Sequence, residues 1–119
     1  MHRQIYRDGR ALPKDFDLPA FQGYSTGRWE RDTFVVKTAG FNDKTLLDFM
    51  GHPHSEEWRT EERLRRRDFG HLDYRVTFDD PRMYNKPFTV KIMYELLPDT
   101  DIFEMSCENE KDRLHMLKK

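Results

Sequence analysis

The chain has 119 residues, of which 36% are hydrophobic and 36% are charged, with nine Phe, five Tyr and two Trp. We expect residues 1–119 to form a single β-rich domain with a modest core. The 21 basic and 22 acidic residues nearly cancel, which argues against a nucleic-acid partner held through a basic excess. No apolar run approaches the roughly 18 residues of a membrane span, so we expect no membrane partner.

The first 22 residues predict an extended arm. They combine Asp8-Gly9-Arg10, Pro13 and Pro19 with scattered aromatic side chains, a composition typical of turns and extended backbone. One short strand is expected within this arm, at residues 4–6.

Alternation of apolar and polar residues, bounded by turn residues, predicts most of the remaining chain to be β-strand. The polar Glu30-Arg31-Asp32 joins the first two of these strands as a hairpin, and Asp79-Asp80-Pro81 ends the strand before it, with Asp79 expected to cap backbone amides. The predicted strands are 23–29, 33–38, 58–65, 71–78, 88–96 and 102–107.

Residues 56–68 are ambiguous between helix and strand. Their Glu and Arg content favours a helix by propensity, yet Trp58 and Leu64 are the only large apolar residues and form no helical stripe. Trp58, Thr60, Glu62 and Leu64 share one side of an extended chain, and the neighbouring segments are strands. We therefore predict a strand here.

The end of the chain carries the single cysteine. Cys107 excludes an internal disulfide and a zinc site built from cysteines, and we interpret it as a small buried hydrophobe. Residues 108–119 form a charged tail that is predicted to be a short helix or frayed.

About six strands in up-and-down order, with only short helical pieces, imply a mainly β antiparallel meander. Such a sheet needs one face covered, and few helices are available to cover it. We therefore predict a small antiparallel β-barrel or a strongly curved half-barrel.

Residues 40–57 are the strongest candidate in the sequence for a ligand-binding or catalytic site. This long connection between strands holds two of the five histidines, four carboxylates and several large apolar residues. Long loops inside compact domains are usually functional or disordered, and this one is too apolar for a disordered linker. Asn42-Asp43 is expected to cap a short helix at residues 44–49. We predict that the loop lines a pocket at one end of the sheet.

A metal site is the first hypothesis for this loop. His52 and His54 lie two residues apart and share a side of an extended backbone. With Glu57 or Asp48 they can form a His-His-carboxylate set of the kind that binds zinc. The spacing does not require a metal, and we expect no resident cofactor; the alternative is that these imidazoles only hydrogen-bond loop backbone.

Acid–base chemistry is the second hypothesis. His52 or His54, oriented by Asp43 or Asp48, can move a proton at neutral pH. The function we expect is binding, and in the enzymatic case transforming, a small partly apolar molecule. The further side chains expected to contact this ligand are Arg28, Trp29, Trp58 and Tyr84.

The third hypothesis is an interaction module with no small-molecule activity. A thin core and exposed sheet edges favour association, so we expect a homodimer. In that case the 40–57 loop packs at an interface. Whether the chain is an enzyme stays open between these hypotheses.

Several motifs together resemble a large family of bacterial proteins with no established activity. They are Gly27-Arg28-Trp29-Glu30-Arg31-Asp32-Thr33, Gly40-Phe41-Asn42-Asp43, Gly51-His52-Pro53-His54-Ser55-Glu56, Glu62-Arg63 and Asp79-Asp80-Pro81, in this order over nearly the whole chain. The family pattern is GRWEGDT…GFND…GHPHSE…ER…DDP. This chain departs from it with Arg31 where Gly is usual, and with Leu47 and Phe88 where Trp is common.

The resemblance bears on location. Members of the family are often secreted or periplasmic, with an additional N-terminal domain. Met1 to Gln4 do not lead into a signal peptide, so the sequence as written predicts a cytoplasmic protein. A periplasmic location is expected if the chain is a processed or truncated member of that family.

Overall fold

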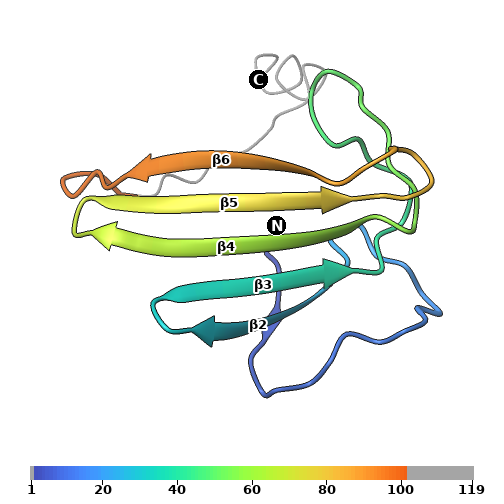
Figure 1. Ribbon diagram of the computed structural model, residues 1–119, viewed down its shortest axis with the longest axis horizontal. Helices are drawn as coiled ribbons and strands as arrows, with labels where there is room; N and C mark the ends of the chain where they lie inside the picture. The colour runs from blue at the N-terminus through green and yellow to red at the C-terminus, as the bar shows by residue number, and fades with distance from the viewer. Residues whose placement is uncertain (1, 102–119) are drawn as a thin grey trace, which may run out of the picture.

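The protein is a mainly β structure built on one sheet of six strands, in a computed structural model that describes residues 2–101. The predicted strand at 102–107 and the tail at 108–119 lie outside the described residues. The strands follow one another across the sheet in chain order (Figure 1). They are β1 (Ile5–Tyr6), β2 (Tyr24–Glu30), β3 (Thr33–Ala39), β4 (Arg59–Asp68), β5 (His71–Asp79) and β6 (Phe88–Glu95).

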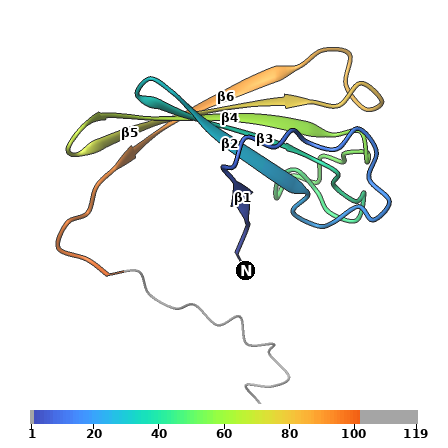
Figure 2. The ribbon, with the colours of Figure 1, turned by 90° about the horizontal axis from the view of Figure 1, so that it is seen from below.

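The sheet is open, so the predicted barrel or strongly curved half-barrel is wrong. Figure 2 shows a twisted layer whose two edges stay apart. The pairs from β2 to β6 are antiparallel, as the meander predicts, and β1 joins β2 in parallel. Closure would require β1 to pair with β6, but β1 has 2 residues against the 8 of β6.

Residues 2–101 contain no helix, so the helix predicted at residues 44–49 is also wrong. The Asp48 carboxylate accepts the backbone N–H groups of Met50 (2.9 Å) and His52 (3.4 Å), and Leu47 donates its N–H to the His52 carbonyl (2.8 Å). These local bonds replace the helical hydrogen-bond pattern, as Asp side chains often do. No helix that could span a membrane occurs in this part of the chain.

The ambiguous segment forms β4, which confirms the strand prediction. β4 pairs with β3 on one side and β5 on the other, so Glu and Arg side chains occupy the centre of the sheet. Pairing with both neighbours overrides the helix propensity of this run, because propensity differences are small beside tertiary contacts.

The two faces of the sheet differ in chemistry, as the alternation along each strand predicts. The register places the apolar side chains of five strands on one side, called here the apolar face: Trp29, Phe34, Val36, Leu64, Leu72, Tyr74, Val76, Phe78, Phe88, Val90, Ile92 and Tyr94. The opposite side, called here the charged face, carries Arg28, Glu30, Lys37, Glu61, Arg63, Arg65, Asp73, Arg75, Asp79 and Lys91.

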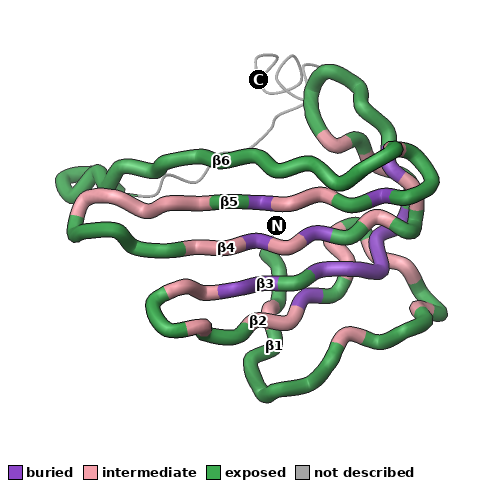
Figure 3. The backbone as a smooth tube through the Cα atoms, in the orientation of Figure 1, coloured by how far each residue is buried: buried purple, intermediate pink, exposed green. Residues whose placement is uncertain are grey.

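The apolar face is covered unevenly. The 40–57 loop lies on one side of the sheet, near β3 and β4 (Figure 2), and Arg3 reaches the same side to bind Glu62. Residues 9–12 of the arm lie instead beside Arg28, Val35 and Lys37 on the charged face, where Val35 is 1% exposed. Val36 is 0% exposed beneath this cover, and Val76 is 6% exposed. Every residue of β6 is exposed, and Figure 3 shows that strand as a continuous exposed edge. The core therefore lies under β3, β4 and the middle of β5.

Arg31 and Gly40 are two of the five described residues with a positive φ. In the β2–β3 hairpin, Arg31 has a φ of 56°, a value that favours glycine. Gly40, which ends β3 and opens the loop, has a φ of 76°. A Cβ atom at Gly40 would also collide with the ring of Phe16, which stacks on Tyr24 at 5.4 Å between ring centroids. Gly40 thus lets the arm pack where the loop begins.

Gly40→Ala should lower the free energy of unfolding by about 3 kcal/mol, because it adds both a strained φ and a collision with Phe16. Gly51→Ala is the matched control. Gly51 has a φ of 88° with nothing within 4 Å of an added Cβ, so only the backbone strain of about 1 kcal/mol should appear. Urea denaturation of both variants measures the difference, and equal losses would contradict the packing role of Phe16.

Candidate functional site

The 40–57 loop closes on itself. Leu46 and Pro53 form an isolated antiparallel bridge, and Tyr84 donates its hydroxyl to the Pro53 carbonyl at 2.8 Å. The larger depressions on the described surface are lined by strands, the arm and the turns, and none by residues of this loop. The loop-lined pocket therefore stays a prediction.

His54 is a buried side chain with both ring nitrogens engaged. It is 4% exposed. Its Nε2 lies 2.8 Å from the Thr45 hydroxyl, and its Nδ1 lies 3.1 Å from the Ser55 carbonyl. Because a carbonyl only accepts, Nδ1 is the donor, and in the neutral ring Nε2 accepts from the Thr45 hydroxyl. This arrangement leaves no free nitrogen for a metal or a substrate proton.

His52 is exposed and belongs to a different environment. Its Nδ1 lies 2.7 Å from the Asp48 carboxylate, and this hydrogen bond lowers the pKa of Asp48. Glu57, the third predicted metal ligand, lies near Arg82 at 3.7 Å. No group of three metal-ligating side chains converges anywhere in residues 2–101. The predicted set of His52, His54 and Glu57 therefore does not assemble.

The other predicted ligand-binding residues are dispersed. Arg28 pairs with Glu30 at 2.7 Å on the charged face, whereas Trp29 is 58% exposed at the end of the apolar face. Asp43 is exposed, and its neighbour Asn42 accepts the N–H of Lys44 in an Asx turn. These side chains do not meet at one site.

Trp58 is instead the centre of an aromatic cluster that packs the loop onto the sheet. Its ring lies 4.3 Å from those of Phe41 and His54 and 5.9 Å from that of Phe78, between centroids. Aromatic pairs at these separations stabilise a core beyond their buried area. Its buried Nε1 has no protein acceptor among the described residues. The loop is thus the second layer of the fold at this end.

The structure brings together one polar group that sequence reasoning did not identify. Glu62, on the apolar face, receives two hydrogen bonds from the Arg3 guanidinium (2.8 and 3.2 Å) and one from the Tyr74 hydroxyl (2.8 Å). Burial, and then the hydrogen bond to Glu62, raise the pKa of Tyr74. Charge pairing satisfies a carboxylate that is otherwise costly to bury. The network attaches the arm to the sheet, and its partners are 59 and 12 residues from Glu62, too far apart for a sequence motif.

Asp80, not the predicted Asp79, caps the turn after β5. Its carboxylate accepts the Ser55 backbone N–H (2.6 Å), the Ser55 hydroxyl (2.7 Å) and the amides of Arg82 and Met83 (3.2 Å each). Asp79 is exposed as the last residue of β5. Side chains alternate between the two faces along β5, and this alternation places the Asp79 side chain in solvent. The next residue, Asp80, is the one whose carboxylate is buried and can accept the amide hydrogen bonds.

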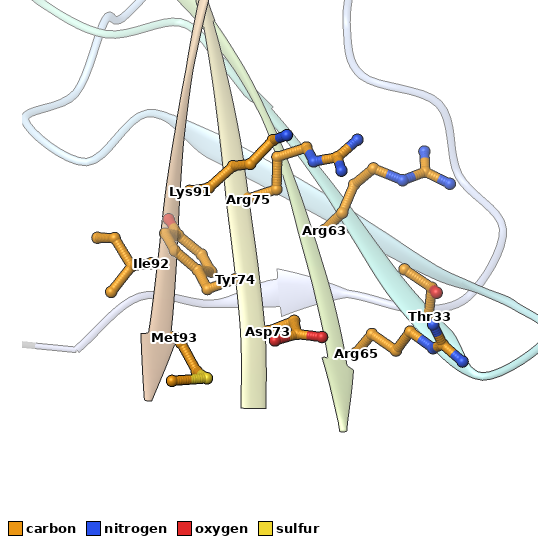
Figure 4. A pocket seen from close by; sticks show the side chains of 9 residues that line it. All are labelled: Thr33, Arg63, Arg65, Asp73, Tyr74, Arg75, Lys91, Ile92 and Met93. Atoms are coloured by element: carbon orange, nitrogen blue, oxygen red, sulfur yellow. The ribbon is translucent and has the colours of Figure 1, made fainter. Parts of the chain in front are cut away.

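A depression of about 520 Å³ lies on the charged face, over β4, β5 and β6. The side chains that line it include four cations and one carboxylate, shown in Figure 4: Arg63, Arg65, Arg75, Lys91 and Asp73. Arg63 donates to Glu30 at 2.6 Å, and Arg65 donates to Asp32 at 2.9 Å.

His54→Ala should lower the free energy of unfolding by about 2 to 4 kcal/mol, because it opens a cavity beside Trp58 and leaves the Thr45 hydroxyl unpaired. His52→Ala, at an exposed position, should cost less than about 0.5 kcal/mol. Chemical denaturation measures both. A stable His54→Ala variant would contradict the structural role of this imidazole.

Asp80 should make the stability pH-dependent. Burial alone raises its pKa, but the hydrogen bonds from Ser55, Met83 and Arg82 together outweigh burial, and the pKa lies below its ordinary value. Its contribution to the free energy of unfolding is therefore fully present above the unfolded-state pKa, about 3.9, and is lost as the pH falls through the folded-state pKa.

Asp80→Asn should be less stable than the wild type at neutral pH and should lose less stability on acidification. Urea denaturation between about pH 7 and about pH 2.5 measures this difference. Asp43→Asn removes an exposed carboxylate and should leave the neutral-pH midpoint unchanged. Parallel pH curves for Asp80→Asn and the wild type would contradict the assignment.

Comparisons of the chain with protein-family models, curated proteins and solved structures gave no match. The resemblance to the bacterial family stays a prediction. The function is therefore argued from the contacts, exposure and charges described above.

Proposed function

We propose that the chain is a self-associating β-sheet module whose β6 edge pairs with β6 of a second copy. The observation that supports this is that β6 is the outermost strand of the sheet formed by residues 2–101, with 8 residues, all of them exposed, and apolar side chains on one face. The opposite edge, β1, has 2 residues and offers little backbone for pairing. Exposed edges present unpaired N–H and C=O groups that readily bind another strand.

The apolar residues at this edge are exposed enough to gain from burial. Phe88, Val90, Ile92, Tyr94 and Leu96 are 38 to 47% exposed, although they continue the apolar face of the core. A sheet face of this composition usually packs against a second layer. Pairing two β6 strands would extend the apolar face across both subunits and shield its margin from water.

One antiparallel register around a two-fold axis continues the apolar face of β6 from one copy to the other. With Ile92 on the axis, Val90 faces Tyr94 of the partner subunit and Phe88 faces Leu96 of the partner subunit. On the charged face the same register sets Lys91 against Met93 of the partner subunit. Placing Lys91 on the axis would set it against its own copy, and like charges directly opposite are destabilising.

A second candidate is acid–base transformation of a small partly apolar molecule at the 40–57 loop. One observation favours it: the 2.7 Å hydrogen bond between His52 and Asp48, which resembles the pairing that orients a general base. In that case the exposed side chains around His52 would have to make the contacts that bind the substrate. Loss of turnover in His52→Ala, with folding intact, is the result that would favour this candidate.

Sedimentation equilibrium of the full chain, from about 1 µM to about 1 mM, tests the proposal. One strand per subunit makes a smaller interface than the ~800 Å² per partner of stable complexes, so we expect a dissociation constant of roughly micromolar order. Ile92→Asp should abolish the dimer because it buries a charge on the axis. Leu18→Asp, at a position 77% exposed in the arm, is the control and should dimerise normally.

A cysteine cross-link tests the register. In a Cys107→Ser background, Ile92→Cys should form an intermolecular disulfide on mild oxidation, because the axis sets the two thiols opposite each other. Thr100→Cys in the same background lies beyond β6 and should not cross-link at a comparable rate. A wild-type chain that stays monomeric to about 1 mM would contradict the proposal.

A further inference from the structure

Three cations form a row across neighbouring strands of the charged face. Arg63 on β4 lies directly opposite Arg75 on β5, and Arg75 lies directly opposite Lys91 on β6. Figure 4 shows the three side chains extending from the sheet on the same side. We call Arg63, Arg75 and Lys91 the cationic row.

The charges of this row are only partly neutralised. Arg63 is paired with Glu30 at 2.6 Å and with Glu61 at 3.1 Å. No carboxylate of residues 2–101 lies within ion-pair distance of Arg75 or Lys91. Directly opposed like charges destabilise a sheet, so the row costs the isolated fold some stability. An anion bound across it would remove that repulsion.

The surface at the row is hollowed. The depression of about 520 Å³ is within the size range of small-molecule sites, and Thr33 and Arg65 line it beside the row. Neighbouring strands lie ~4.8 Å apart, so the three cationic groups span roughly 10 Å at their bases. This span matches a molecule with two or three anionic groups better than a single small ion.

We infer that the depression binds a compact polyanion with two or three phosphoryl or carboxyl groups. The guanidinium of Arg75 donates two parallel N–H groups, which fit either group, and Lys91 adds a point charge. Glu30, Asp32, Glu61 and Asp73 surround the row on this face. They would repel an extended strand of nucleic acid along its length, whereas a compact anion in the depression meets only Asp73 among them, which lines the depression beside Arg65.

This site lies on the face opposite to the apolar face, and it does not depend on the proposed dimer. Arg75 belongs to β5, one strand inward from the edge. Substituting Arg75 therefore tests anion binding without changing the edge that self-association would use.

Isothermal titration of the full chain with inorganic tripolyphosphate and, separately, with citrate tests the site at low salt, where screening is weakest. Arg75→Gln should weaken binding at least about tenfold. Lys86→Gln removes one exposed positive charge from the turn before β6, and it should bind as the wild type does. Tighter binding of tripolyphosphate identifies phosphoryl groups as the ligand chemistry, and tighter binding of citrate identifies carboxyl groups.

The thermal stability of the Arg75→Gln variant shows whether Arg75 serves anion binding or stabilises the fold. Without ligand, Arg75→Gln should raise Tm by about 2 °C because it relieves the repulsion from Arg63 and Lys91. A fall in Tm, equal weakening in Lys86→Gln, or no binding of either anion would overturn the inference. Tighter binding of a twenty-nucleotide single-stranded DNA than of tripolyphosphate would overturn it as well.

Discussion

The apolar face of a sheet is stable only when other segments shield it from water. In residues 2–101 those segments cover the face at β3 and β4 but not at β6, and the other features follow from this difference. Over β3 and β4 the cover comes from the arm and the 40–57 loop, and Val36 beneath it is fully buried. Toward β6 no described segment provides an equal cover, and the apolar side chains of that strand remain partly exposed. The same meander therefore supplies both the core and an edge strand whose apolar side chains are partly exposed. A closed barrel would have removed that edge.

The cover is held by polar groups that satisfy one another. Arg3 and Tyr74 neutralise and hydrogen-bond Glu62. Asp80 binds the Ser55 amide and hydroxyl, and His54 uses both of its ring nitrogens. Such groups are expensive to bury unpaired, so each contact fixes where the covering segment can lie. Side chains committed in this way have little remaining capacity to bind a ligand.

The charged face has the opposite character. Most of its charges are paired at the surface, where an individual ion pair contributes little to stability. The cationic row stands out because Arg75 and Lys91 lie opposite like charges instead of opposite a carboxylate. Two surfaces are thus available for interaction, an apolar edge and a cationic depression. They differ in the partner that each one suits, because apolar side chains gain from burial and unpaired cations gain from an anion.

The sequence by itself determined the strands and the character of each face. Alternation predicted β5 and β6, and it predicted β4 against its own helix propensity, because a period of two in the chain is a local property. Local pattern also predicted the β2–β3 hairpin at Glu30 to Asp32.

Only the tertiary structure decided whether the sheet closed, which histidine was buried, and which charges met. Closure depends on the length and partner of β1, and the burial of His54 depends on contact with Trp58 and Phe41. The Arg3–Glu62 pair and the cationic row join residues from different strands or from the arm, and the register of strand pairing sets them. Long-range contacts of this kind leave no spacing in the chain from which they could be predicted, because each is created by folding.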